Sequence, residues 1–239
     1  MIYGLVFGCI GVVTFIYTNN NLRDKYYNNK EDLSERKRVI GSIQLTDKKE
    51  SRFPLSANYI GKYTKLQKQH YLITLIMFVI FNALAFELYF NNYTKLHMNH
   101  NHLIYIPIDV SVSLFINSIC YYYYHRLVHT KYLYKYIHSY HHAYLSPEPF
   151  DSLVGHPIDH TFSAILQILP MFIYKMHIVS FLTYSSILST MGIYDHCGVK
   201  IKIFGYKSLD HHIHHKYPAK NFTTWAAIDK FHGTYKSIL

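Results

Sequence analysis

The chain alternates between apolar runs and blocks of polar residues. Four runs are apolar enough to be membrane segments: residues 71–90, 103–124, 161–174 and 178–194. The first two are long enough to cross a hydrocarbon core of ~30 Å as helices. A short connection follows the first run and another follows the third. The pattern therefore predicts an all-α membrane protein with about four transmembrane helices in two hairpins.

A further uncharged apolar run occupies residues 2–17, which would form ~24 Å of helix. We expect an N-terminal anchor helix there. A cleaved signal peptide is the alternative, but no basic residue precedes the run and no small-residue cleavage site follows it at residues 17–20. Residues 18–70 are polar and charged, as expected of a solvated connection. The predicted organisation is an anchor and polar segment (1–70) followed by a membrane-embedded domain (71–239).

Polar and proline residues within the apolar runs predict which side chains face other helices and where a helix is interrupted. Pro107, Asp109 and Asn117 interrupt the second run. The polar side chains should face other helices, because a polar group in contact with lipid is costly. Pro170 predicts that the third run is tilted, broken or only partly embedded.

The formal net charge is +10. Nucleic-acid binding would call for a basic stripe, whereas the basic residues here flank apolar runs, so we expect no nucleic-acid partner. With four spans, residues 18–70, 125–160 and 195–239 share one side and hold 12, 3 and 7 of the 24 Lys and Arg residues. Lys95 and Lys175 lie in the opposite turns. The positive-inside rule then predicts that the richer side is cytosolic.

Among the 18 histidines, three stretches stand out by spacing: HRLVH, HSYHH and HHIHH. Residues three and four apart share a helix face, so each cluster should direct two or three imidazoles the same way. Neutral imidazole is a metal ligand, and an unpaired buried imidazole is costly. One ion rarely takes more than six protein ligands, so eight histidines predict two ions in a shared pocket. The eight are His125, His129, His138, His141, His142, His211, His214 and His215.

A single straight helix could not bring the first two clusters together. At ~100° per residue, His129 and His138 would lie on opposite sides of it. We therefore expect a bend between Thr130 and Tyr136. All three clusters fall on the predicted cytosolic side, which places a helical cap with a dimetal site there.

The other histidines are weaker candidates. His196 follows an apolar run at the predicted cytosolic edge and is expected as a ninth ligand. His156 is a candidate tenth ligand or a neighbour of the ligands, although Pro157 disfavours an α conformation there. His160 is a weaker ligand candidate than His156. His212 lies off the helix face that His211, His214 and His215 share, so we expect it to be a neighbour of the ligands or a surface residue. Six histidines lack the cluster spacing and are interpreted as surface or hydrogen-bonded residues: His70, His97, His100, His102, His177 and His232.

The ligand type narrows the chemistry. Nitrogen ligation without thiolates suits Zn, Cu, Ni or Fe. An excess over the four ligands of a closed structural zinc site indicates a reactive two-metal centre. A redox-active pair beside the bilayer would suit O₂ activation against a C–H bond of a lipid substrate. A non-enzymatic membrane metal-binding or transport protein is the alternative, but Glu87, Asp109 and Asn117 are too few to define a transport path.

The three motifs resemble the histidine boxes of the membrane fatty acid hydroxylase and sterol desaturase superfamily. Within it, SPEPFDSLVGHPIDHTFSAILQILP (146–170) is similar to part of the sterol C5-desaturases, also called lathosterol oxidases. YKYIHSYHH before it and NFTTWAAIDKFHGTYK (221–236) after the last box extend the likeness, which covers about residues 105–236.

The resemblance implies two Fe ions, O₂ as co-substrate, and electrons from NADH through cytochrome b5 reductase and cytochrome b5 at the endoplasmic reticulum membrane. The implied reaction introduces a C5–C6 double bond into a Δ7-sterol during sterol biosynthesis. The eight cluster histidines would be ligands, with His196 added. No haem or flavin domain is visible, so the reductant should be a separate protein. The basic face could dock it by charge; attraction to anionic lipid is the alternative.

Two positions depart from the C5-desaturase pattern. Asp210 stands where many members have another histidine, and Cys197 follows His196 where an acidic residue is common. Both leave the boxes intact but weaken the choice of desaturation over hydroxylation. A hydroxylase of the same superfamily, acting on a sterol, fatty acid or sphingoid base, is therefore the alternative function.

Overall fold

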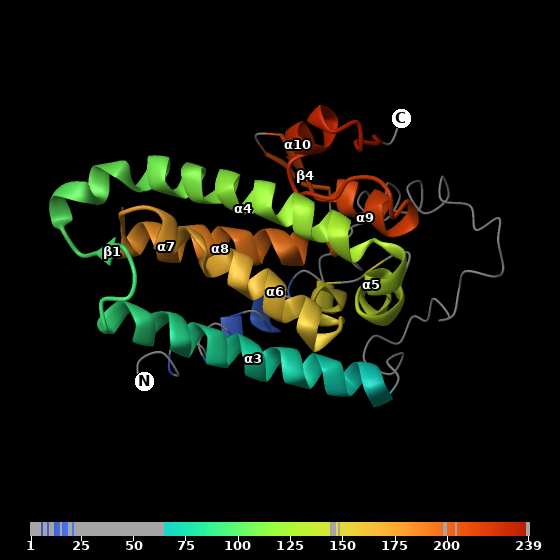
Figure 1. The fold of residues 1–239 in the computed structure, drawn as a ribbon, viewed down its shortest axis with the longest axis horizontal. Helices are drawn as coiled ribbons and strands as arrows, with labels where there is room; N and C mark the ends of the chain where they lie inside the picture. The colour runs from blue at the N-terminus through green and yellow to red at the C-terminus, as the bar shows by residue number, and fades with distance from the viewer. Residues whose placement is uncertain are drawn as a thin grey trace.

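A computed structural model describes residues 65–143, 147, 149–197, 200–203 and 205–237, together with residues 6, 9, 12–14, 16–18 and 21. Most of the predicted N-terminal anchor and of the polar segment after it lies outside the described residues. The described part is mainly helical, as predicted (Figure 1). Its elements are α3 (Lys65–Phe90), β1 (Leu96–His97), η1 (His100–Tyr105), α4 (Ile106–Val128), α5 (Lys131–Tyr136), η2 (His138–Ala143), η3 (Pro149–Leu153), α6 (Pro157–Ile168), α7 (Pro170–Ile173), β2 (Met176–His177), α8 (Ile178–Tyr194), β3 (Lys202–Ile203), β4 (Tyr206–Lys207), α9 (Leu209–Lys216) and α10 (Ala226–Phe231).

Two helical stretches are long and apolar enough to span a membrane: α3, and η1 with α4 (His100–Val128). Only 11% and 28% of their apolar windows are buried, whereas a core helix of a soluble protein would be mostly buried. Large apolar side chains such as Ile80 and Phe115 therefore point outwards, as they would towards lipid.

The expected count of four spanning helices is not reached in the described residues. The fourth predicted run forms α8, which has 17 residues and thus ~26 Å of helix, short of a full span. The third run is divided, because α6 ends at Ile168 and α7 begins at Pro170. Proline lacks the backbone N–H that would continue α6, so the predicted break at Pro170 is confirmed.

The polar side chains of the second apolar run face other helices, as predicted. Ser180 Oγ donates to the Asp109 carboxylate at 2.8 Å, and Asn117 Nδ2 donates to the Leu166 carbonyl at 3.1 Å. Both contacts join α4 to neighbouring helices rather than to lipid. Pro107 lies in the first turn of α4, where its missing N–H costs little.

The turns opposite the histidine clusters meet at one end of the helices. β1 pairs in parallel with β2, and Lys95 Nζ donates to the Ile173 carbonyl at 2.8 Å. The helices α3, α4, α6 and α8 extend from these turns to the other end, where α5 and α9 lie (Figure 1). Lys95 and Lys175 thus share the end that is remote from the three histidine clusters.

The predicted bend after the first histidine cluster is present. Helix α4 ends at Val128, and Thr130 is extended with φ −68° and ψ 151°. A second break follows at Ile137 (φ −120°, ψ −62°), just beyond the expected interval. The chain then enters η2, so the second cluster lies on a 3₁₀ turn and not on the expected α-helix.

Candidate metal centre

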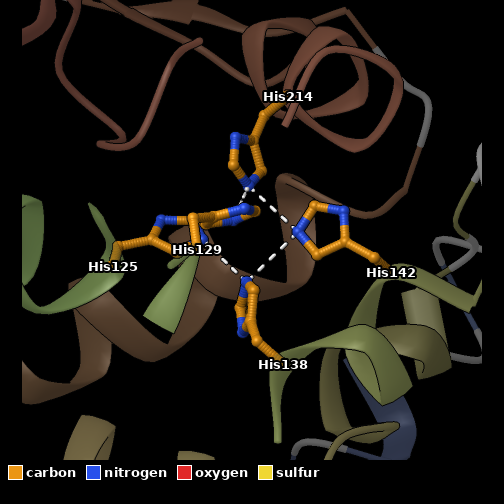
Figure 2. Close-up of side chains that lie close together, drawn as sticks. All are labelled: His125, His129, His138, His142 and His214. Atoms are coloured by element: carbon orange, nitrogen blue, oxygen red, sulfur yellow. Dashed lines mark hydrogen bonds between the residues drawn. The ribbon is translucent and has the colours of Figure 1, made fainter. Parts of the chain in front are cut away.

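The structure brings the nine histidines expected as ligands into two groups. Within each group, one ring nitrogen from every residue lies within 4.8 Å of the others. The five-histidine group consists of His125, His129, His138, His142 and His214 (Figure 2). The four-histidine group consists of His141, His196, His211 and His215.

Each motif contributes to the groups according to its spacing. The pairs four residues apart stay together: His125 with His129, His138 with His142, and His211 with His215. The histidine three residues after the first one belongs to the other group. His141 therefore joins the four-histidine group, and His214 joins the five-histidine group. Successive side chains on a helical turn diverge by ~100°, which allows one short motif to serve two neighbouring sites. The expectation that each cluster points one way thus holds only for the i, i+4 pairs.

The Nε2 atoms form close contacts inside each group. In the five-histidine group, Nε2 of His142 lies 3.1 Å from Nε2 of both His138 and His214 (Figure 2). In the four-histidine group, Nε2 of His196 lies 3.2 Å from that of His141 and 3.1 Å from that of His211. The nitrogen atoms of each group therefore surround a common point.

The Nδ1 atoms show which ring nitrogen carries the hydrogen. Nδ1 of His125 donates to the Phe222 carbonyl at 2.6 Å, and Nδ1 of His214 donates to the Lys220 carbonyl at 2.7 Å. Nδ1 of His196 donates to the Gly192 carbonyl at 2.7 Å. A carbonyl can only accept, so Nε2 of each neutral ring carries a lone pair. Each close Nε2 contact then brings two lone pairs together with no hydrogen between them. This arrangement is unfavourable unless a cation lies between the two nitrogens.

The spacing fits metal ligation. Two imidazole nitrogens held at right angles, each ~2.1 Å from one ion, are about 3.0 Å apart. The observed Nε2 separations of 3.0 Å (His125 to His138) and 3.1 Å (His129 to His214) agree with that value. Imidazole-only donors suit a first-row transition metal. The residues therefore fit two metal ions, one in each group.

Burial favours the neutral form of seven of these imidazoles. It lowers the pKa of His196 from 6.5 to about 4. Burial, followed by the neighbouring imidazoles, also lowers the pKa of six other histidines: His129, His141, His142, His211, His214 and His215. Neutral imidazole is the form that ligates metal, so these seven imidazoles need no deprotonation at neutral pH.

We predict that the metal-free protein loses stability as the pH falls from 6.5 towards 4. In this interval an unfolded His196 binds a proton and the folded one does not, because its pKa is lowered to about 4. The free energy of unfolding therefore decreases with falling pH. Thermal unfolding of chelator-treated protein across this interval measures the effect. An unfolding temperature that stays constant or rises on acidification would contradict the prediction.

A carboxylate supports one histidine of the five-histidine group. Nδ1 of His138 donates to Asp159 Oδ2 at 2.7 Å, and the Tyr124 hydroxyl donates to Asp159 Oδ1 at 2.5 Å. Asp159 is 6% exposed. Burial raises the pKa of its carboxyl, but His138 and the hydrogen bonds from His138 and Tyr124 outweigh burial and hold that pKa below its ordinary value. Asp159 is therefore ionised and fixes the His138 ring.

The C-terminal segment supports two more histidines through its main chain. The carbonyls of Lys220 and Phe222 accept from His214 and His125. The buried carboxylate of Asp229 holds this loop by accepting from the backbone N–H groups of Phe222 (2.8 Å) and Thr223 (2.9 Å). It also accepts from the hydroxyls of Thr223 and Thr234. Asp229 is thus the centre of a clamp on the five-histidine group.

These supporting residues carry no clear signal in the sequence. Tyr124, Asp159 and Asp229 lie within the region that resembles C5-desaturases, but no periodicity marks them. The one local signal is that Asp159 stands in HPIDH, and Asp229 in AAIDKF, as isolated acidic residues beside apolar positions. Asp and Glu are almost never fully buried without a partner, so a buried position for either residue would imply a hydrogen-bonded or charged partner.

The remaining histidines lie outside both groups. His156, the candidate tenth ligand, caps the start of α6, and its Nδ1 accepts from the Ile158 N–H at 3.2 Å. Pro157 sets this geometry, because it begins α6 and leaves His156 extended. His160 is half-buried and His212 is buried, but neither joins a group. The six histidines interpreted as surface or hydrogen-bonded residues are also absent from the groups, within the part of the chain that the structure describes.

A cavity of about 290 Å³ opens from the histidines into the helical region. At one end its wall includes His138, His141, His196 and His211. Along α8 it extends from Gly192 to Phe181, which is ~16 Å of helix. Apolar side chains of α3, α6 and α8 dominate the far part, among them Phe78, Phe81, Ile168, Phe181 and Leu182. An elongated apolar molecule could therefore lie between the helices with one part at the histidines.

Comparison with known proteins agrees with this arrangement. The fatty acid hydroxylase family model matches residues 110–234, slightly more than half of the 239-residue chain. Fatty acid hydroxylase domain-containing protein 2 of Homo sapiens is 28% identical over 129 residues, covering 53% of this chain and 38% of that protein. Lathosterol oxidase of Homo sapiens is 29% identical over 171 residues, covering 66% of this chain and 56% of that protein.

A third relative is the Delta(7)-sterol 5(6)-desaturase of Candida glabrata, 27% identical over 161 residues, which cover 63% of this chain and 43% of that protein. The chain thus spans about 38% to 56% of the length of these relatives. No solved structure matches it significantly. The matched segment contains every histidine of both metal groups and the carboxylates that support them. The chain belongs to the fatty acid hydroxylase family.

Proposed function

We propose that this chain is an O₂-dependent di-iron oxidoreductase that introduces a C5–C6 double bond into a Δ7-sterol. Family membership supports an oxidoreductase that acts on a membrane lipid. The observation that carries the proposal is the position of nine convergent imidazoles at one end of an apolar cavity between membrane helices. Such a pocket brings a C–H bond of a lipid next to the metal ligands and away from water.

The parts of the chain have separate tasks in this reaction. The two histidine groups would each hold an iron ion, and the bound pair would supply the activation of O₂. Apolar side chains such as Phe81, Ile168 and Phe181 bind the hydrocarbon and exclude water. Asp159 and the clamp around Asp229 keep the imidazoles oriented. The side chains would thus hold the ions and position the lipid, and the redox chemistry would come from the bound metal.

The sterol substrate rests on the relatives named lathosterol oxidase and Delta(7)-sterol 5(6)-desaturase. A hydroxylase is the second candidate, because the family model and another relative bear that name. The two activities yield different products. A desaturase forms a conjugated 5,7-diene with characteristic ultraviolet absorption, and a hydroxylase forms a hydroxylated lipid without it.

We also propose that the histidine end faces the cytosol at the endoplasmic reticulum, with residues 71–239 as the oxidoreductase domain and residues 1–70 as anchor and cytosolic segment. The positive-inside rule supports this orientation, since Lys95 and Lys175 share the opposite end, beside the paired strands β1 and β2. Cytochrome b5 and its reductase would supply electrons, and the basic face would attract the acidic donor. A rate of reduction by cytochrome b5 that does not change with salt would contradict docking by charge.

Expression in a yeast strain that lacks its sterol C5-desaturase tests the proposal. Sterol profiling should show a 5,7-diene sterol and a fall in the accumulated Δ7-sterol. The matched control is His142→Ala, which removes a nitrogen 3.1 Å from two others of its group and should give no diene. If the wild-type protein is inserted in the membrane and a hydroxylated lipid appears instead of the diene, the hydroxylase is correct.

A substitution at Gly192 should obstruct the cavity without touching a ligand side chain. A Cβ built at Gly192 meets nothing within 4 Å, so the main chain and its bond to His196 can remain. Gly192→Leu would place methyl groups in the cavity beside the histidines. We expect lipid oxidation to fall by about tenfold or more, since pockets discriminate single methylene groups by about that factor. Bound metal should stay at the wild-type level, and Gly192→Ala serves as the milder control. Unchanged oxidation with Gly192→Leu would show that the substrate binds elsewhere.

A further inference from the structure

The short helix α10 carries an exposed aromatic side chain at the histidine end of the molecule. Phe231, its last residue, is 86% exposed, the largest fraction among the exposed large hydrophobic side chains of the described residues. Helix α10 lies beside the part of α4 that leads into the first histidine cluster (Figure 1). The Phe231 ring is therefore free to contact a surface next to α4.

Ring contacts fix the end of α10 against the side of α4. His232 directly follows Phe231, and its ring stacks on Tyr122 with centroids 4.3 Å apart and an interplanar angle of 13°. The centroid of the His232 ring also lies 5.1 Å from that of Phe231 and 5.6 Å from that of Tyr123. Phe231 and Tyr123 thus flank the same imidazole, and both are exposed.

Tyr123 belongs to an exposed apolar stripe that runs along α4. At ~100° per residue, the members of this stripe fall within about one third of the helix circumference. The helix that carries them is long and apolar enough to span a membrane, so the stripe is its lipid-facing side. Phe231 lies beside the end of the stripe nearest the histidines. The exposed members on α4 are Ile108, Val112, Phe115, Tyr123 and Leu127.

We propose that α10 contacts the bilayer surface on the histidine side, with Phe231 inserted beside Tyr123 and Leu127. These three side chains form the interface patch. The bilayer is the partner because the patch continues the lipid-facing stripe of α4, and because aromatic rings are enriched where a span leaves the hydrocarbon. The exposed Arg126 next to Leu127 suits lipid phosphate. This inference rests on the proposed placement of α4 across a membrane, but not on the reaction.

The lipid contact also supports the five-histidine group. Asp229 stands two residues before Phe231 on α10, and its carboxylate accepts from the N–H groups of Phe222 and Thr223 at 2.8 and 2.9 Å. The Phe222 carbonyl in turn accepts from Nδ1 of His125. By holding α10 against α4, the bilayer steadies the loop that orients this imidazole.

Tryptophan fluorescence of the purified protein in lipid nanodiscs tests the contact. The chain has one tryptophan, Trp225, and its signal in the unsubstituted protein is subtracted. Phe231→Trp should lose fluorescence with phospholipids brominated near the headgroup end of their acyl chains, and should resist iodide in the water. The matched control is Ala219→Trp, exposed in the turn after α9, which should show the reverse.

Amide hydrogen exchange tests the connection to the metal centre. Phe231→Ser removes the ring from the bilayer surface, so the N–H groups of Phe222 and Thr223 should exchange about 3–10-fold faster in nanodiscs, the factor expected for partial burial of one aromatic ring. Ala227→Ser introduces the same side chain at another exposed position of α10. It should leave both exchange rates at the wild-type value.

Strong quenching of Phe231→Trp by iodide would place the ring in water. Resistance to both quenchers would place it against protein, either another part of this chain or a second copy. Each result would overturn the lipid contact, and wild-type exchange in Phe231→Ser would overturn its support of the five-histidine group. These measurements need neither substrate nor turnover, so their failure is distinct from failure to oxidise a lipid.

Discussion

His141→Ala is expected to abolish lipid oxidation while lipid binding persists. Nε2 of His141 lies 3.2 Å from Nε2 of His196, and its ring forms part of the cavity wall. The substitution removes one of four nitrogens from the group that faces the cavity. Loss of a partner outside the ligand shell costs 10–100-fold in comparable sites, so loss of a ligand should reduce the rate by at least about 100-fold. The measurement is turnover of the Δ7-sterol together with binding of a radiolabelled sterol.

The matched control for His141→Ala is His100→Ala. His100 is exposed and lies at the opposite end of the helices, outside both groups. It should retain wild-type turnover. This pair also separates an enzyme from a metal carrier, because a carrier would lose metal in His141→Ala but would show no lipid oxidation in the wild type. Oxidation by His141→Ala within about tenfold of wild type would rule out His141 as a ligand.

Asp229→Asn should release the clamp on the five-histidine group. The carboxylate accepts from two backbone N–H groups and two hydroxyls, and it is 1% exposed. An amide has one acceptor oxygen and would direct N–H groups at donors. Each buried donor left without an acceptor costs ~1–3 kcal/mol. We expect a lower unfolding temperature and a metal affinity reduced by about 10–100-fold.

Chelator competition and thermal unfolding measure the effect of Asp229→Asn, with Lys230→Ala as its neighbour control. Lys230 is exposed on the same short helix, and its removal should change neither quantity appreciably. Wild-type metal affinity in Asp229→Asn would show that the carbonyls of Lys220 and Phe222 do not orient His214 and His125. It would also leave the buried carboxylate with a role in stability alone.

The candidate ligands could be predicted from the sequence because the signal that marks them is local. The spacing of His125 and His129, or of His211 and His215, places two imidazoles on one face whatever surrounds them. The need for a bend at Thr130 follows from the same helical arithmetic. His196 could be found because it follows an apolar run at the predicted membrane edge. The structure gathers these residues without exception.

The division between the two groups could not be predicted, because it depends on how separate elements pack. Whether His141 turns towards His196 or towards His142 is decided by the 3₁₀ geometry of η2 and by the position of α8. Asp159 and Asp229 carry no periodic signal, since each acts through a contact distant in sequence. Two described stretches have the length and composition of a membrane span, so the predicted count of four spans stays a prediction, with the third run divided at Pro170 and α8 only 17 residues long.

We propose that distant histidines hold two ions beside the lipid. Metal analysis of the purified protein after anaerobic reconstitution with iron is the decisive measurement. We expect two equivalents of tightly bound iron per chain, with fewer than two retained by His142→Ala and two by His100→Ala. Wild-type protein that is folded and membrane-inserted yet retains one equivalent or none would contradict it.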